Sequence, residues 1–406
     1  VTVAPGNPGM ELDGIRTTQI NPSNHAALID FVKNNGYDWV FVGPEVPLIE
    51  GIVDDFAGAG IKAFGPSKAA AQIEGSKDFA KQLMERHDIP TAKYQTFDDL
   101  ERSTAYVREH GAPIVIKADG LAAGKGVTVA MDEETAIAAL EDIFVDHRFG
   151  NAGAKVVIED FLEGQEFSLM SFVNGTDFWP MPISQDHKRA YDGDKGPNTG
   201  GMGAYSPVPQ IGQDVVDTAI ETIVKPTVQA MSDEGTPFTG ILYAGLIATA
   251  DGPKVIEFNA RFGDPETQAV LPLVEGDLLE IMIATQAGTL DKCEIKLSDK
   301  SSCCLVLASG GYPEKYEKGK LITFDGDVEA DCGVCIFHAG TKLRAPDSSE
   351  FVTSGGRVLG ITAVRDTLEE AVRAAYAAAE RVHFDGKYSR SDIGLSALRE
   401  SRLKNG

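Results

Sequence analysis

The sequence predicts a multidomain protein that combines α/β and α+β units, with a parallel sheet at the N-terminal end and a small β-rich unit at the C-terminal end. Three observations lead to this fold class. Apolar strands alternate with amphipathic helices over the first 70 residues, which is typical of parallel sheets. Strand patterns then dominate between Val156 and Phe262, and beyond residue 300 short strands are separated by glycine-rich turns. The 406-residue length suits two to four domains of about 150 residues each.

The N-terminal alternation is expected to run through five elements. These are strand Val1–Ala4, helix Asn24–Asn35, strand Trp39–Gly43, a helix from about Leu48 and strand Ile61–Phe64. Apolar residues recur at helical spacing in the first helix, with Ser23 as its predicted N-cap and Gly36 at its end. The uninterrupted apolar run Trp39–Gly43 indicates a strand that is covered on both faces.

The middle of the chain is expected to open with one long helix, Ser67–His87, which ends before Pro90. Strands are predicted at Tyr94–Phe97, Ile114–Lys117, Val127–Ala130, Val156–Ile158, Leu242–Ala250 and Lys254–Phe258. Helices are predicted at Asp98–His110, Glu133–Phe144 and Asp277–Ala287. Asp251 and Gly252 form a hairpin signal between the last two strands.

In the C-terminal part, the expected elements are strands Ser302–Ala308, Cys335–His338 and Val358–Val364 and an alanine-rich helix near Glu369–Val382. Five sparse cysteines fit a reducing compartment, and we expect a cytoplasmic protein. Cys332 and Cys335 form a CxxC that reads as part of a strand, so we expect a structural role. No apolar run reaches the roughly 18 residues of a membrane span, so no membrane partner is expected.

The charge balance restricts the partners and the substrates. A formal charge of -24 and a pI near 4.7 argue against nucleic-acid or anionic-membrane partners, which need a basic surface. An anionic substrate would need a local cluster of lysine and arginine side chains at its binding site. The candidate site segments contain such a concentration: Lys77, Lys117, Lys125, Lys188, Arg189 and Arg261.

The first candidate motif is the segment IKADGLAAGKGV, Ile116–Val127. A strand ends in Lys117, enters a loop of small residues and returns to a strand. The glycines allow several N–H groups to turn toward one anion, and lysines suit phosphate. It is not a Walker A loop, because no Ser or Thr follows the loop lysine and a strand follows the loop. The alternative is a glycine-rich hairpin with solvated lysines.

The second motif is the segment Val255–Glu266. On a strand, Glu257, Asn259 and Arg261 share one face. Glu257 and Asn259 offer the hard oxygen ligands that suit nucleotide-bound Mg²⁺, and Arg261 could hold a carboxylate or a transferring phosphoryl group. The alternative is a half-exposed strand with alternating polar residues.

Two further segments are candidates. Ser184–Arg189 and Gly196–Gly203 are too polar and glycine-rich for core and read as one long loop, either functional or a disordered surface insertion. Ile158–Glu166 joins an apolar strand to another through an acidic turn, which could meet an adenine edge and ribose hydroxyls or could be an ordinary connection.

The order of these motifs resembles the ATP-grasp superfamily and, within it, the phosphoribosylamine–glycine ligase family. The resemblance covers essentially the whole chain. Its segments are VGPEVPL (Val42–Leu48), EGSKDFAK (Glu74–Lys81), IKADGLAAGKGV, SQDHKR (Ser184–Arg189), GPNTGGMGAYSP (Gly196–Pro207) and IEFNARFGDPETQ (Ile256–Gln268). It implies an ATP-grasp fold with a Rossmann-like domain at 1–73, an ATP-grasp domain at 74–296 with a flap subdomain at about 91–162, and a C-terminal β-rich domain at 297–406.

The resemblance also implies roles for single residues. The implied ATP-binding residues are Lys77, Lys117, Gly120, Gly124, Lys125, Gly126, Glu159, Phe161, Leu162 and Glu166, and the implied ligands of Mg²⁺ or Mn²⁺ are Glu257 and Asn259. The implied acceptor-site residues are Gly6, Asn7, Pro44, Glu45, Asp186, Asn198 and Arg261. The implied catalytic residues are Arg261, Asp186, Lys188, Asn198 and Asp264. Three residues are candidates for pairing with the ammonium group of glycine: Asp186, Asp264 and Glu266.

The implied reaction joins glycine to 5-phosphoribosylamine at the expense of ATP, through glycyl phosphate, in purine biosynthesis. We expect a monomer or small homo-oligomer. The family's opening strand and GNGGREHA-type loop have no counterpart here, so we expect an upstream segment to be missing. The alternatives are a related carboxylate–amine ligase, a biotin-dependent carboxylase, and a nucleotide-binding regulator without turnover.

Overall fold

The computed structural model describes residues 1–122, 126–148 and 150–399. Its N-terminal elements are β1 (Thr2–Val3), α1 (Pro8–Leu12), β2 (Arg16–Thr17), α2 (His25–Asn35), β3 (Trp39–Phe41), α3 (Glu45–Glu50), α4 (Ile52–Gly58) and β4 (Lys62–Phe64). The parallel arrangement is confirmed, but β1 pairs with β2 and β3 with β4 in two separate two-stranded sheets. The predicted cap of α2 is wrong by one residue, because the side chain of Asn24 accepts from the Ala27 amide; Gly36 ends α2 in the left-handed region as predicted.

The single long helix expected over Ser67–His87 is wrong, because it breaks at Ser76. Two helices, α5 (Gln72–Gly75) and α6 (Lys77–Arg86), replace it. Ser76 is extended at φ -140° and ψ 117°, and its hydroxyl accepts from the Phe79 amide as the N-cap of α6. The cap starts a second helix and places Lys77 at its first position.

The next unit is an antiparallel sheet with strand order β5-β8-β6-β7. Its elements are β5 (Tyr94–Phe97), α7 (Leu100–His110), β6 (Ile114–Ala118), β7 (Val127–Ala130), α8 (Glu133–Phe144), a 3₁₀ turn (Gly150–Gly153) and β8 (Val156–Asp160). Helices α7 and α8 pack on it through a separate apolar cluster that includes Val107, Leu140 and Ile116. The range predicted for α8 is confirmed residue for residue.

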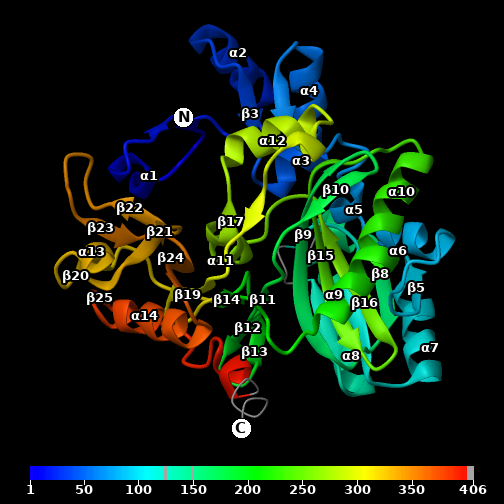
Figure 1. Ribbon diagram of the computed structural model, residues 1–406. Helices are drawn as coiled ribbons and strands as arrows, with labels where there is room; N and C mark the ends of the chain where they lie inside the picture. The colour runs from blue at the N-terminus through cyan, green and yellow to red at the C-terminus, as the bar shows by residue number, and fades with distance from the viewer. Residues whose placement is uncertain (123–125, 149, 400–406) are drawn as a thin grey trace.

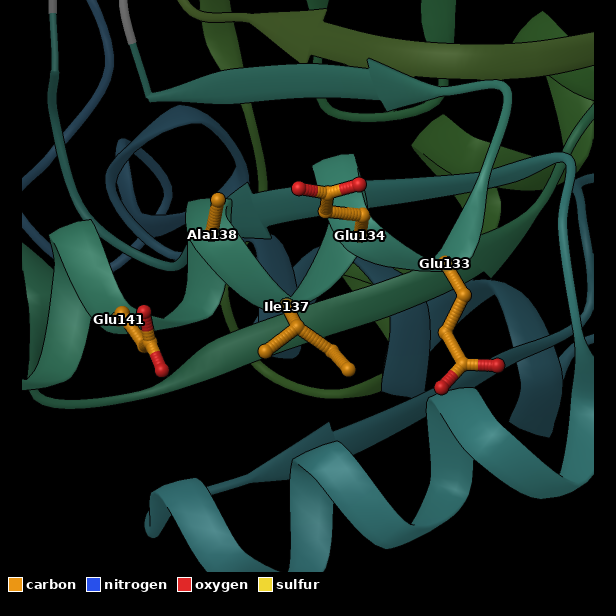
Figure 2. Close-up of a pocket in the computed structure, with 5 residues that line it drawn as sticks. All are labelled: Glu133, Glu134, Ile137, Ala138 and Glu141. Atoms are coloured by element: carbon orange, nitrogen blue, oxygen red, sulfur yellow. The ribbon is translucent and has the colours of Figure 1, made fainter.

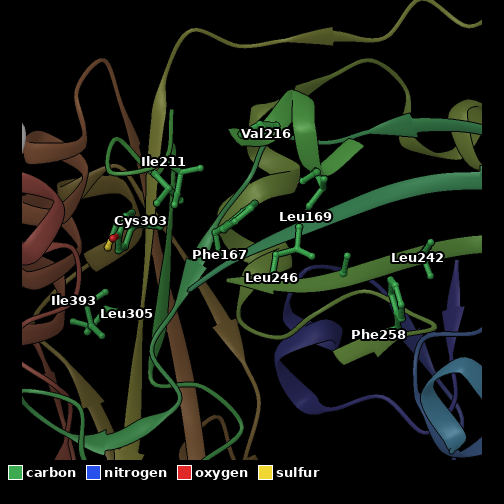
Figure 3. Packing of buried hydrophobic residues seen from close by; sticks show 14 of the residues in the cluster. Phe167, Leu169, Ile211, Val216, Leu242, Leu246, Phe258, Cys303, Leu305 and Ile393 are labelled. Atoms are coloured by element: carbon green, nitrogen blue, oxygen red, sulfur yellow. The ribbon is translucent and has the colours of Figure 1, made fainter. Parts of the chain in front are cut away.

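A second antiparallel sheet has the order β10-β9-β15-β16. Its strands are β9 (Gln165–Asn174), β10 (Asp177–Pro180), β15 (Thr239–Thr249) and β16 (Gly252–Asn259). Two helices pack against this sheet: α9 (Gln213–Ala219) and α10 (Lys225–Asp233), which are joined by a π-helical turn (Ile220–Val224). The hairpin at Asp251 is confirmed. Figure 3 shows Phe167, Leu169 and Leu246 in the same buried cluster as Leu305 and other residues of the C-terminal part, so one core joins the two parts.

The long loop predicted over 184–203 is wrong, because four short strands include parts of this segment. It forms β11 (Gln185–Asp186), β12 (Arg189–Tyr191), β13 (Lys195–Asn198) and β14 (Gly203–Ser206). β14 lies between β11 and β19 (Ser301–Ser309), and Tyr205 is fully buried. The glycine reflects close packing and not disorder, because a Cβ on Gly203 would lie 2.8 Å from the Cys304 carbonyl oxygen.

The C-terminal part is β-rich as predicted. The elements that precede it are α11 (Glu266–Val270), a 3₁₀ turn (Leu271–Leu273), β17 (Val274–Glu275), α12 (Leu278–Gln286), a 3₁₀ turn (Leu290–Lys292) and β18 (Lys296–Leu297). Besides β19, the elements of the C-terminal part are β20 (Leu321–Phe324), α13 (Val328–Cys332), β21 (Val334–His338), β22 (Thr341–Leu343), β23 (Phe351–Thr353), β24 (Arg357–Arg365), α14 (Leu368–Glu380), β25 (Val382–His383) and β26 (Lys387–Tyr388). The alanine-rich α14 packs on β19 and β24, and α1 lies beside β21 and β22 (Figure 1). The CxxC is not wholly in a strand, since Cys332 ends α13.

In the part of the chain that the structure describes, no helix has the length and apolar character that crossing a membrane requires.

Candidate active site

Lys117 and Glu257 come from different sheets and meet at one site. Lys117 lies on β6, and its ammonium group donates to the carbonyl oxygen of Ile256 on β16 at 2.9 Å. Glu257 is the next residue on that strand, and Lys117 and Lys77 both help to lower its pKa. The two sequence motifs therefore face one common space.

The carboxylate of Glu159, on β8, holds two lysines. One oxygen lies 2.8 Å from the Lys117 ammonium and the other 2.9 Å from that of Lys81 on α6. All three side chains are almost completely buried. Burial lowers the pKa of Lys81 to about 8, although Glu159 opposes that shift. The sequence did not single out Lys81, although it closes the quoted segment EGSKDFAK.

Lys77 reaches the root of the predicted flap. Its ammonium group donates to the carbonyl oxygens of Gly120 at 3.2 Å and Asp119 at 3.4 Å, and its amide also binds the Asp119 carbonyl. Burial lowers the pKa of Lys77, while Glu257 opposes the shift. Gly120 and Gly126 have no room for a side chain, since a Cβ would lie 2.9 Å from Ala152 and 2.6 Å from Ala122 respectively. The predicted Gly124 and Lys125 lie outside the described residues.

Glu257 and Asn259 lie two residues apart on β16, and Lys188 pairs with Glu257 at 3.4 Å. Lys188 lowers the pKa of Glu257 to about 2, against the effect of burial. Asp186 and Glu257 hold the pKa of Lys188 well above its ordinary value, although burial alone would lower it. An ionised carboxylate beside an amide oxygen fits Mg²⁺ as two hard ligands, with phosphate oxygens and water completing the shell. Among the described residues, no group of three or more His, Cys, Asp or Glu is placed to hold a metal.

Arg261 lies between two glutamates. Its guanidinium group lies 2.7 Å from Glu74 and 3.4 Å from Glu45, and it donates to the side-chain oxygen of Asn259 at 3.3 Å. Glu74 also accepts from the Ala260 amide at 2.7 Å, which fixes the start of the turn. Burial raises the pKa of Glu74 to about 7, against the pull of Arg261. Glu74 was not predicted; the sequence signal was its place in the quoted segment EGSKDFAK.

The three carboxyl groups considered as the partner of glycine's ammonium group differ in the side chains that they contact. Glu266 accepts a hydrogen bond from Tyr243 at 2.5 Å, and Asp264 pairs with Arg357 of β24 at 2.8 Å. Asp186 lies on β11 near Lys188, and burial raises its pKa to about 8 although Lys188 opposes the shift. A protonated carboxyl group can release its proton when a cation arrives, so Asp186 can respond to an incoming ammonium group.

The remaining predicted residues contact other parts of the chain or lie near turns. Asn7 caps α1 and donates to the His338 carbonyl oxygen at 2.9 Å, so the Gly6–Asn7 turn contacts the C-terminal part. The Asn198 side chain donates to Val127 of β7 at 3.5 Å. Phe161 and Leu162 are half-buried in the turn between β8 and β9, Glu166 is exposed on β9, and Pro44 directly precedes α3.

A surface pocket on α8 does not share these properties. Figure 2 shows that it is lined by Glu133, Glu134, Ile137, Ala138 and Glu141. Three carboxylates without a lysine or arginine would repel a triphosphate. The convergence of lysines around Glu257 is therefore the better candidate for an anion site.

Comparisons with known proteins show which family the chain matches. Family models for phosphoribosylglycinamide synthetase match the chain in three parts: the N domain at residues 1–74, the ATP-grasp (A) domain at 75–267 and the C domain at 302–396. The phosphoribosylamine–glycine ligase of Listeria innocua is 54% identical over 98% of this chain and 93% of its own length.

Solved structures show the same architecture. The phosphoribosylamine–glycine ligase of Thermotoga maritima has a TM-score of 0.82 and 35% identity, covering 97% of this chain and 93% of that one. Biotin carboxylase of Campylobacter jejuni has a TM-score of 0.73 at 15% identity, covering 100% and 90% respectively, and shares the fold alone. The predicted ATP-grasp fold is confirmed.

Proposed function

The chain belongs to the phosphoribosylglycinamide synthetase family, and we propose that it joins glycine to 5-phosphoribosylamine, converting ATP to ADP and phosphate and giving glycinamide ribonucleotide. It is a carbon–nitrogen ligase of purine biosynthesis. The single observation that carries the site assignment is that Lys77, Lys117 and Glu257 converge from three elements, with Glu257 two residues along β16 from Asn259, which Arg261 contacts. The five free thiols among the described residues fit the reducing cytoplasm, where we place the enzyme.

We propose that Lys77 and Lys117 bind the nucleotide phosphates. Both ammonium groups now donate to backbone carbonyl oxygens, which phosphate oxygens can replace as acceptors. Glu159 and Glu166 lie on the strands that flank the Phe161–Leu162 turn, which we assign to the adenosine. Glu257 and Asn259 would hold Mg²⁺ or Mn²⁺, whose charge offsets that of the triphosphate.

In the first chemical step, a carboxylate oxygen of glycine attacks the γ-phosphorus of ATP, and the bond from that phosphorus to the ADP oxygen breaks. Arg261 orients the carboxylate, and Asp186 receives the ammonium group, because Asp264 and Glu266 already have close partners. The products of this step are glycyl phosphate and ADP.

In the second step, the amine of phosphoribosylamine attacks the carbonyl carbon of glycyl phosphate. Phosphate leaves, the amine loses a proton and the amide bond forms. We assign the acceptor to the space bounded by Glu45, Asn198 and the Gly6–Asn7 turn. No protein nucleophile takes part.

The test measures ADP release with each substrate omitted in turn. We expect ADP and glycinamide ribonucleotide in equal amounts only when ATP, a divalent cation, glycine and phosphoribosylamine are all present. ADP release that depends on bicarbonate would support a biotin-dependent carboxylase instead. Tight ATP binding without turnover under any combination would support the regulator.

A further inference from the structure

We propose that Arg390 is a positioning residue: it anchors the β12–β13 hairpin to the C-terminal part, and the anchored hairpin keeps Lys188 and Asn198 in place over the reacting groups. This inference rests on the proposed function. Arg390 is 201 positions away in sequence from Arg189, the hairpin residue whose carbonyl oxygen it bonds.

Arg390 is buried and fully engaged. Its guanidinium group makes two 2.7 Å hydrogen bonds to Asp392, one of 2.7 Å to Asp194 and one of 3.1 Å to the Arg189 carbonyl oxygen. Its side chain is 1% exposed. Arg189 begins β12 and Asp194 lies in the hairpin turn, so one guanidinium group holds both the start of that strand and the turn that follows it.

The neighbours of Arg390 reinforce this anchor. Asp192 accepts hydrogen bonds from the amide, at 2.8 Å, and the hydroxyl group of Ser391. The Gly193 amide donates to Asp392 at 2.8 Å, and the Tyr388 hydroxyl donates to the Ala190 carbonyl at 2.9 Å. Every residue from 189 to 194 except Tyr191 thus bonds to the segment 388–392, and the Tyr191 and Tyr388 rings are in edge contact.

The other end of the hairpin reaches the site. The Thr199 amide and hydroxyl group both donate to the Lys188 carbonyl, at 2.7 and 2.9 Å, which closes the base of the hairpin. From this base Lys188 extends to Glu257 at 3.4 Å and Asn198 to Val127 at 3.5 Å. Val127 begins β7, directly after the glycine-rich segment. The hairpin therefore connects the C-terminal part both to Glu257 and to the strand that follows the flap.

This placement has a chemical consequence. Glycyl phosphate must survive until the amine attacks, and water competes for the same carbonyl carbon. A hairpin that moves away from Glu257 and Val127 admits water there. Loss of the anchor therefore raises the ADP released for each glycinamide ribonucleotide formed, in addition to slowing the reaction.

Two variants test the anchor by measuring both products. Arg390→Lys keeps the charge but cannot bond Asp392, Asp194 and Arg189 together. Asp194→Asn weakens only the hairpin side, and the Asp194 side chain is 70% exposed, so the fold should persist. We expect kcat/KM for phosphoribosylamine to fall about 10- to 100-fold in Arg390→Lys and less in Asp194→Asn. The ratio of ADP to product should rise in both.

The matched control is Arg344→Lys, which alters an exposed arginine–carboxylate pair of the C-terminal part, Arg344 with Glu350. We expect its coupling ratio and rate to match the wild type. The coupling ratio does not depend on how much enzyme is folded, so it separates positioning from stability. Loss of rate at an unchanged ratio would overturn the proposal, as would full activity in Arg390→Lys. A wild-type enzyme that makes no product would instead refute the proposed function.

Discussion

Two glutamates of the site, Glu159 and Glu257, differ in how their charge is compensated. Glu159 is buried, and its two oxygens form ion pairs with different lysines at N···O distances of 2.8 and 2.9 Å. Glu257 has one close lysine, Lys188 at 3.4 Å, and its side chain is 31% exposed. One carboxylate is enclosed by fixed partners, whereas the other keeps a face open to solvent.

This difference indicates that the charge of Glu159 is structural and that the charge of Glu257 is available for binding a cation. Removal of one partner from a group of buried charges leaves an uncompensated charge, which is strongly destabilising, so Glu159 fixes where Lys117 lies. A partly open carboxylate with a low pKa can exchange its partner for an incoming cation without first losing a proton. Electrostatic neighbours alone would not distinguish the two residues, since Lys117 lies close to both.

The largest effect is expected from Glu159→Gln, which leaves the buried ammonium groups of Lys81 and Lys117 without a counter-charge. We expect the free energy of unfolding to fall by about 3–5 kcal/mol. Urea unfolding of the purified variant measures it.

Lys81→Met is the matched control for that change. It leaves Glu159 and Lys117 as a balanced pair, so its cost should be clearly smaller than that of Glu159→Gln. Equal costs would mean that lost packing, and not uncompensated charge, determines the effect.

The next effect is on activity. In Glu257→Gln, we expect kcat to fall about 100-fold or more at saturating ATP and Mg²⁺, because a charged ligand near the phosphates is lost. The melting temperature should change little, because the site is half-open and Lys188 can turn to solvent. Steady-state kinetics and thermal unfolding measure the two quantities. A large fall in melting temperature with normal kcat would reverse the roles assigned to the two glutamates.

The smallest effect concerns Glu234, whose pKa is also about 2 but whose hydrogen-bond partners, Arg86 and His87, lie on the surface. Its folded-state pKa is below the ordinary glutamate value of 4.5, so its stabilisation is present above pH 4.5 and is lost as the pH falls toward 2. Solvent screening limits it to less than about 1 kcal/mol. Unfolding of wild type and Glu234→Gln should therefore differ slightly at pH 6 and converge near pH 2; a constant difference would exclude this pair as the cause.

Local sequence patterns predicted the elements whose capping residues, apolar periodicity or turn residues lie within the element itself. Helix Glu133–Phe144 has its cap and periodicity within its own sequence, and the hairpin at Asp251 has its turn residues. The encounter of Lys117 with the β16 motif was also predictable, although only through the resemblance to a known family.

The missed features depend on distant partners. Glu74 meets Arg261 across 187 positions, and Arg390 meets Arg189 across 201, so no local spacing reveals either contact. Ser76 breaks a helical pattern partly because its hydroxyl donates to Asp119, which directly follows β6. The glycine-rich segment that contains β14 looked like a loop, because its pairing with β19 is invisible until the chain folds back on itself.

The position of β14 also determines which fragments of the protein can fold without an exposed strand edge. β14 bonds to β11 on one side and to β19 on the other, although more than 90 residues separate β14 from β19. A fragment that ends before β19 would present a bare strand edge, which invites pairing with other chains and precipitation. Chimeras that exchange the C-terminal part between relatives should therefore carry residues 203–206 along with it.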